Sequence, residues 1–310
     1  MTTATSTTDS TAPSSLGSRL FGTVPAMRAW AIGSLAVNML LIVTGAVVRL
    51  TSSGLGCPTW PQCSDTSYVP RAALGIHGVI EFTNRMLTFV LVALAIGMAV
   101  SAFRVKATAA GSSMRPIRTL AVAAGLGIPL QAVLGGLTVL TRLNPWLVSL
   151  HMLLSVAIIS LCVVMVHRTY DTSAIAVSRV AHRLVLAIVA ATVLVVVLGT
   201  VVTGAGPHAG DDGTIQRNGI SPDAAAHAHA GAVWVLVILT VAALVITRSR
   251  LVAALLAVQL VQGVIGYVQY FTGLPIVGVA LHMAGLAVLT AATAHVFWRL
   301  RDVVQDANAG

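Results

Sequence analysis

Charge is what this sequence has least of. Only 9% of its 310 residues are Asp, Glu, Lys or Arg, whereas soluble globular domains carry about 25%. Lys106 is the single lysine, and 57% of the residues are hydrophobic. So little charge excludes a soluble globular protein and predicts an integral membrane protein. The net charge of +9 comes from arginines that stand singly between apolar runs, which is typical of loops beside membrane helices and not of a nucleic-acid-binding patch.

Long apolar runs predict the fold class. About 20 apolar residues in a helix cross the hydrocarbon core of a bilayer, so each run of that length is a candidate membrane span. We therefore predict an all-α integral membrane protein with eight transmembrane helices. The runs are 28–50, 76–103, 119–141, 148–167, 184–204, 225–246, 251–272 and 277–298.

The basic residues predict the orientation. If eight helices alternate in direction, thirteen Lys and Arg residues fall on the side of the termini and five on the other. Because the side richer in basic residues is cytoplasmic, both termini are expected in the cytoplasm. Residues 1–27 and 299–310 are then cytoplasmic tails, the first of them disordered, and 168–183 is a cytoplasmic linker. The loops 52–75 and 205–224 are expected on the outer face.

The sequence contains an internal repeat. Corresponding helices would run in the same direction through the membrane, which makes the repeat parallel. It predicts two four-helix bundles, 28–167 and 184–298. The matched positions are Gln131 with Gln262, Gly135 with Gly266, Leu-His-Met at 150–152 with Leu-His-Met at 281–283, and Gly45-Ala-Val-Val with Gly199-Thr-Val-Val.

Histidines mark the candidate site. An ionisable group inside a membrane is costly, so each one is a functional candidate. His151, His229 and His282 each lie about one turn into a helix from the outer face. Two imidazoles on facing helices of a four-helix bundle can ligate a haem iron. We predict this role for His229 with His282, and for His151 with a residue of the helix 76–103. The alternative for each histidine is a hydrogen bond to a neighbouring helix.

The helix 76–103 carries the other polar candidates. His77, Glu81 and Asn84 lie four and three residues apart and therefore share one helix face. Glu81 is the only acid inside the eight runs and could relay protons or orient a substrate, with a plain ion pair to Arg85 as the alternative. Arg85 and Arg49 lie near the outer interface, where they would bind haem propionates or extend toward the lipid headgroups.

Cys57 and Cys63 lie in the predicted outer loop 52–75. That side of the membrane is oxidising, which favours a disulfide. A metal site would need further ligands close by in the sequence, and none is evident. Whether such a bond is structural or changes redox state stays open.

In these motifs the chain resembles the haem A synthases, a bacterial family related to a mitochondrial enzyme. The resemblance covers 28–298 and implies oxidation of the C8 methyl of haem O to a formyl group, by hydroxylation, a second oxidation and loss of water. It also implies a haem b on His229 and His282, the substrate haem on His151, and a role in activity for Glu81. The segments that carry it are GAVVRLTSSGLGCPTWPQC (45–63), IEFTNR (80–85), LGGLTVLTRLNPWLVSLHM (134–152) and PIVGVALHM (275–283).

One position departs from the family pattern. Many members carry His where this sequence has Asn84, and Asn is a poor haem ligand. Either His151 alone ligates the substrate haem and leaves an open sixth position, which suits oxygen chemistry, or His77 supplies the sixth ligand.

The resemblance also implies a location and partners. We expect a multi-pass protein of the plasma membrane that binds haem O, haem A and lipid, works beside the haem O synthase and cytochrome oxidase assembly, and binds no nucleic acid. The main alternative is a non-catalytic diheme cytochrome b electron carrier, which would use the same histidines without needing Glu81. A parallel repeat also allows a transporter, but the polar groups gather near one surface, which disfavours it.

Overall fold

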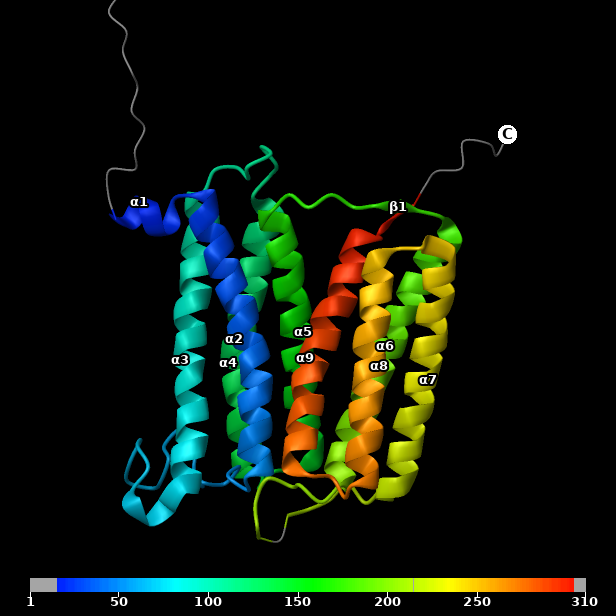
Figure 1. Cartoon of the computed structure of the whole chain (residues 1–310). Coiled ribbons are helices and arrows are strands. Elements are labelled where there is room, and N and C mark those ends of the chain that lie inside the picture. Colours follow the sequence, from blue (N-terminus) through cyan, green and yellow to red (C-terminus); the bar gives the residue numbers. More distant parts are fainter. Residues whose placement is uncertain (1–15, 214, 304–310) are drawn as a thin grey trace, which may run out of the picture.

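The computed structural model describes residues 16–213 and 215–303 (Figure 1). Within these residues, eight helices of 22 to 33 residues are long and apolar enough to cross a membrane, which confirms the all-α membrane fold. They are α2 (Val24–Leu50), α3 (Gly75–Arg104) with the preceding 3-10 helix η1 (Ala72–Leu74), α4 (Arg115–Leu140), α5 (Pro145–Thr169), α6 (Arg179–Ala205), α7 (Pro222–Thr247), α8 (Arg250–Phe271) and α9 (Ile276–Arg299). The remaining elements are α1 (Leu16–Phe21) and the two-residue strands β1 (Ala176–Val177) and β2 (Asp302–Val303).

Capping residues define where the helices begin. The side chain of Asn144 accepts hydrogen bonds from Trp146 N and Leu147 N, two of the N–H groups that the first turn of a helix leaves without a helical partner. Ser178 and Ser221 cap α6 and α7 in the same way. Because polar first turns carry these caps, several helices begin about one turn before the apolar run that predicted them.

The N-terminal tail predicted for 1–27 is shorter than expected. Its last twelve residues, 16–27, hold α1 and the start of α2. Thr23 caps α2 with its side chain, and Phe21 stacks on Trp30 with ring centroids 5.5 Å apart. This local packing orders a segment whose composition alone indicated disorder. The first fifteen residues lie outside the described part of the chain.

The predicted linker and C-terminal tail contact one another. β1 and β2 pair in parallel, with Ala176 opposite Asp302, and Ile175 N donates to the carbonyl oxygen of Arg299 at 2.6 Å. The segment 299–310 therefore continues the fold as far as residue 303, and the rest of it lies outside the described residues.

The helices form the two predicted halves, α2–α5 and α6–α9. Each half buries its own apolar cluster, and the halves meet along α2, α5, α6 and α9. Ile42, Ile159 and Ala287 are buried at this junction, and the two methionines of the repeated Leu-His-Met, Met152 and Met283, pack against them. The repeat thus appears in space as two bundles joined through equivalent helices.

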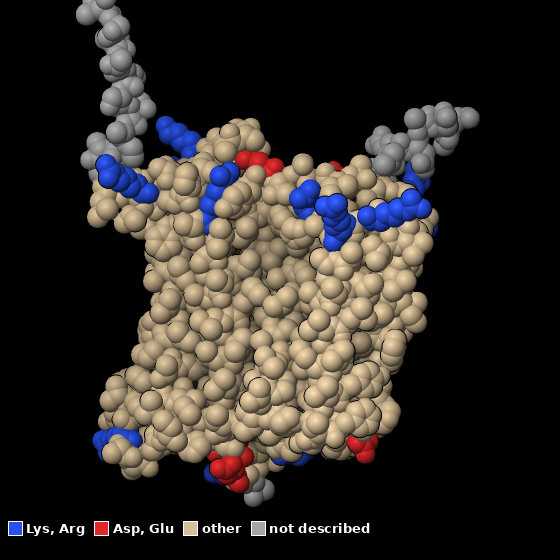
Figure 2. All heavy atoms as spheres, viewed as in Figure 1, with Lys and Arg blue, Asp and Glu red and all other residues tan. Residues whose placement is uncertain are grey.

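The bundle has two chemically different edges. Both ends of the described chain lie at one of them, the terminal edge (Figure 1). On the face shown in Figure 2, Lys and Arg gather along this edge, while the wall below it shows no charged atoms until the opposite edge. That opposite edge, the cysteine edge, is formed by the cysteine loop 51–71 and by the described residues of three connections, 141–144, 206–213 with 215–221, and 272–275.

Candidate functional site

A cavity of about 1850 Å³ lies inside the bundle, and both halves contribute to its wall. Its volume exceeds the roughly 300–1,000 Å³ of ordinary small-ligand pockets. It reaches the cysteine edge and is lined mostly by apolar side chains. Tertiary structure brings most of the predicted site residues to this wall, namely Arg49, Glu81, Asn84, Arg85, His151, His229 and His282.

His229 on α7 and His282 on α9 face one another in the second half. Their ring centroids are 6.4 Å apart, and their planes differ by 75°. Nδ1 of His229 lies 3.0 Å from the carbonyl oxygen of Val195, so this nitrogen carries the proton and Nε2 keeps a lone pair. A backbone carbonyl commonly orients metal-binding histidines in this way. The two rings therefore lie close together on α7 and α9, and the backbone orients that of His229.

Each of the three candidate ligand histidines on the cavity wall lies against a glycine of a neighbouring helix. The ring edge that carries Nδ1 and Cε1 faces the glycine, so an added Cβ would crowd the ring at Gly135 and Gly199 and would touch it at Gly266. The pairs are Gly135 with His151, Gly199 with His229 and Gly266 with His282, where an added Cβ would lie 3.3, 3.2 and 3.5 Å from Cε1.

The fourth position of this pattern is open. Gly45 on α2 corresponds to Gly199 in the repeat, yet a Cβ added at Gly45 would meet no atom of the described residues within 4 Å. Asn84, on the helix that corresponds to α7, accepts a hydrogen bond at Oδ1 from the hydroxyl of Thr44 (2.7 Å). The first half thus has one histidine, His151, where the second half has two, and it has free space beside Gly45.

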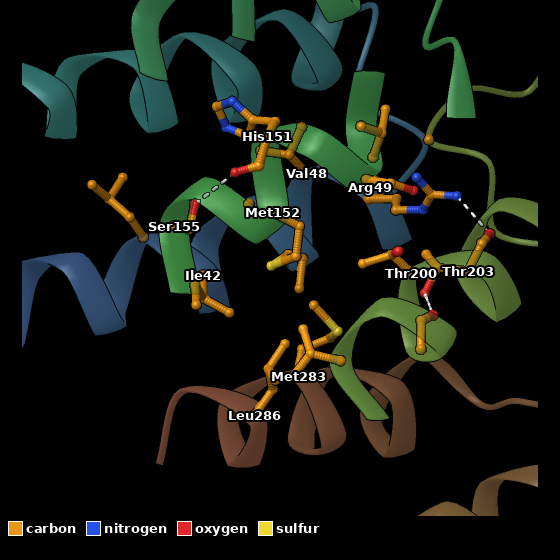
Figure 3. A pocket seen from close by; sticks show the side chains of 18 of the residues that line it. Ile42, Val48, Arg49, His151, Met152, Ser155, Thr200, Thr203, Met283 and Leu286 are labelled. Atoms are coloured by element: carbon orange, nitrogen blue, oxygen red, sulfur yellow. Dashed lines mark hydrogen bonds between the residues drawn. The ribbon is translucent and has the colours of Figure 1, made fainter. Parts of the chain in front are cut away.

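His151 is fixed through its backbone. Gln131 Nε2 donates to Ser155 Oγ (2.6 Å) and to the carbonyl oxygen of His151 (3.2 Å), which joins α4 to α5 at this level. Nδ1 of His151 is buried and has no hydrogen-bond partner among the described residues. This nitrogen lies on the ring edge that faces Gly135. Figure 3 shows His151 and Ser155 on one side of the cavity and Arg49 on the other.

Glu81 and Arg85 form an ion pair that holds the cysteine loop. Arg85 Nη2 lies 2.5 Å from Glu81 Oε1, and Glu81 Oε2 accepts a hydrogen bond from Cys57 N at 2.6 Å. Further N–H groups of Arg85 donate to the carbonyl oxygens of Cys57, Thr59 and Gln62. Both oxygens of Glu81 therefore have partners, as the ion-pair alternative expects, while the same residue lies on the cavity wall.

The cysteine loop covers the first half like a lid. Cys57 and Cys63 form a disulfide, which confirms the predicted bond, and both are fully buried. Trp60, between them, lies against Gly136 of α4, where any side chain would clash with the indole ring. Because Trp60 also lines the cavity, the loop closes the first half at the cysteine edge.

His77 and Arg49 have partners in the protein. His77 Nδ1 lies 3.0 Å from Ser53 Oγ, and His77 is not among the described residues that line the cavity. Arg49 lines the cavity, but its guanidinium group donates to the carbonyl oxygens of His208 (2.7 Å) and Thr203 (2.9 Å). Arg49 therefore joins the first half to the second at the cysteine edge.

Comparison with known proteins places the chain in a family. A profile of the family described as cytochrome oxidase assembly protein (COX15-CtaA) matches residues 28–77 and 76–218. The chain belongs to this family. The match contains Glu81, Asn84 and His151, whereas the histidine pair of the second half lies beyond it. Membership in this family and the eight apolar helices make the chain a multi-pass membrane protein.

Individual relatives carry the name heme A synthase. The protein of Bacillus pumilus is 28% identical over 127 residues, 41% of this chain and 39% of its own length. That of Lysinibacillus sphaericus is 28% identical over 181 residues, 56% and 57% of the two chains. That of Listeria welshimeri is 26% identical over 152 residues, 47% and 48% of the two chains. The chain thus spans about half the length of these relatives.

Two features of the site escaped the sequence reasoning. In the sequence the glycines beside the histidines stood out only as matched positions of the repeat. The repeat is also the signal that could have predicted their place beside the histidines. The second feature is His208, whose Nε2 lies 2.9 Å from the carbonyl oxygen of Leu274 while its own carbonyl accepts from Arg49. No local pattern signals these contacts, because the partners are far apart in the sequence.

Proposed function

We propose that this protein is a haem A synthase, which oxidises the C8 methyl group of haem O to a formyl group through hydroxylation. The carrying observation is the glycine–histidine pattern, in which three of four equivalent positions are filled and the fourth, beside Gly45, is open. One half offers two axial ligands, and the other offers one ligand and free space. This asymmetry suits a resident haem in one half and a haem substrate that must stay reactive in the other. The family and the names of the relatives support the same activity.

The second half is assigned to haem b. The 6.4 Å between the ring centroids of His229 and His282 leaves room for one metal ion. Two imidazole–metal bonds of about 2 Å each, with the distance from each ring centre to its nitrogen added, make up a similar length. The carbonyl of Val195 orients His229, and the ring of His282 rests against Gly266. When bound, haem b would supply one-electron transfer to the other half.

The first half is assigned to the substrate, with His151 as its single axial ligand. We favour a single ligand because His77 bonds to Ser53 and lies off the cavity wall. Asn84 accepts the hydroxyl proton of Thr44, and the space beside Gly45 is left free for a small oxidant. The chain's own contribution is therefore to hold the substrate from one side and keep another side accessible.

Glu81 is assigned to the lid and to proton transfer. Its carboxylate accepts a hydrogen bond from Cys57 N and pairs with Arg85. Because Glu81 also lies on the cavity wall, we assign its carboxylate to proton transfer beside the substrate. Arg85 and Arg49 already donate to backbone carbonyls, so we assign them to holding the loops, with any contact to propionates secondary.

The orientation and the partners follow from the same proposal. The charge distribution supports a cytoplasmic terminal edge and an outward-facing cysteine edge in the plasma membrane. Haem O would come from the haem O synthase, and haem A would pass to the assembly of cytochrome oxidase, the process named by the family. The two half-sites would form separate domains, 28–167 for the substrate and 184–298 for haem b.

Haem analysis of whole cells tests the activity. The protein is expressed in bacterial cells that make haem O but no haem A, and the haems are extracted and separated by chromatography. We expect haem A with the wild type and with the control His182→Ala, which changes a histidine at the terminal edge. His151→Ala should give none. Absence of haem A from wild-type cells in which the protein has bound haem O would overturn the proposal in favour of the electron carrier.

A further inference from the structure

The cavity reaches deeper in the first half than in the second. In both halves the cavity wall follows residues that correspond in the repeat. On α3 and α7 these residues end at Val92 and Val237, and on α4 and α8 they end at Ile128 and Gln259. Among the described residues, only α3 and α4 continue this wall toward the terminal edge, for about 10 Å along the helix axis. This extension, the apolar arm, is lined by Ala95, Ile96, Ala99, Val122, Gly125 and Leu126.

Small residues open the arm, and their counterparts in the second half are larger. Thr240 accepts a hydrogen bond from Gln259 Nε2 at 2.9 Å, which joins α7 to α8 at the level that corresponds to Ala95 on α3. A Cβ added at Gly125 would meet no atom of the described residues within 4 Å, so Gly125 faces open space. In the repeat, Ala95 corresponds to Thr240, Ala99 to Leu244 and Gly125 to Leu256.

The arm is open to the lipid on its outer side. Ile96 and Leu126 at its rim are 59% and 66% exposed, on helices whose exposed surface meets lipid tails. No residue of the arm is polar. Its occupant must therefore be apolar and elongated, and it can be part of the ligand held by His151, since both lie on the wall of one cavity.

We infer that the apolar arm holds the isoprenoid chain of the substrate haem and admits the substrate sideways from the bilayer. The inference rests on the proposed function, because haem O carries a farnesyl-derived chain and haem b carries none. The half assigned to haem O has the arm, whereas the half assigned to haem b has Leu244 and Leu256 at the corresponding positions. The arm thus makes the first half select haem O over haem b. A phospholipid acyl chain is the rival occupant.

Filling the arm tests the inference. Gly125→Leu and, as a second variant, Ala99→Leu introduce the side chains that the second half carries. Gly231→Leu is the matched control, because Gly231 is also helical, has no atom of the described residues within 4 Å of an added Cβ and lies off the cavity wall. Each protein is purified with haem b in the second half, whose spectrum reports an intact fold. The first half is then titrated with haem O and with chain-free protohaem.

The ratio of the two dissociation constants is the readout. We expect the wild type and Gly231→Leu to bind haem O at least tenfold more tightly than protohaem, because tenfold corresponds to burying about two CH₂ groups. Gly125→Leu and Ala99→Leu should lose most of this preference and bind protohaem as before. An unchanged preference, or equal weakening of both haems, would overturn the arm assignment and favour a lipid as its occupant. A wild type that binds no haem O would instead refute the proposed function, and the inference with it.

Discussion

Removing the carboxylate of Glu81 should release the cysteine loop. In Glu81→Ala, Cys57 N loses its acceptor and Arg85 loses its counter-charge, although Arg85 keeps its bonds to the loop carbonyls. The remaining charge is that of Arg85, whose side chain stays partly buried beneath the lid. The closed lid is therefore destabilised relative to an open one, in which Arg85 can reach water.

The size of this effect follows from the pair's geometry. Two charges about 4 Å apart attract by about 4 kcal/mol at an effective dielectric of 20, and removing one partner of a buried pair costs about 3–5 kcal/mol. The Arg85 side chain is 19% exposed, so water screens part of the charge and the lower end applies. About 3 kcal/mol corresponds to roughly a hundredfold shift in the lid equilibrium.

The disulfide provides the assay. Cys57 and Cys63 are fully buried, so a water-soluble phosphine reaches the bond only when the loop opens. Reduction is followed by alkylation of the freed thiols and mass spectrometry. We expect the reduction rate of Glu81→Ala to rise about a hundredfold, and that of Thr83→Ala, an exposed neighbour on the same helix, to stay at the wild-type value.

A double variant separates charge from packing. Arg85→Ala should also speed reduction of the disulfide. In the double variant Glu81→Ala/Arg85→Ala no unpaired charge remains, so its increase in reduction rate should be well below the product of the two single increases. A rate for Glu81→Ala within about threefold of the wild type would refute the reasoning and leave Glu81 without a role in the lid.

Three further outcomes follow from the histidines and their glycines. His282→Ala should remove the low-spin bis-histidine absorption spectrum of the purified protein, and an unchanged spectrum would contradict the second-half assignment. Asn84→His should fit beside Gly45, convert a haem bound in the first half to a six-coordinate low-spin state and stop haem A formation; full activity would contradict a required open position. Gly199→Val should displace the ring of His229 and lower haem b content after purification, whereas Gly45→Val should retain haem b, and equal losses in both variants would contradict the open fourth position.

Much of the fold could be read from the sequence because the membrane makes helix formation a local matter. Within a bilayer, every backbone polar group must be satisfied inside its own segment, so a run such as 184–204 predicts α6 without knowledge of its neighbours. The cysteine pair was equally readable, since its spacing and its predicted side of the membrane sufficed. Residues 16–27 were not, because Phe21 is ordered by a ring on the following helix.

The sequence by itself determined the eight spans, the repeat and the disulfide, and it singled out seven of the polar residues that line the cavity. Only the tertiary structure decided what those residues contact. Glu81 meets Cys57 across 24 residues, and the hydrogen bond from Thr44 to Asn84 depends on how α2 packs on α3. Helix formation is fixed by hydrogen bonds within a segment, whereas cavities and ligand positions depend on side chains of different helices, which no local pattern records.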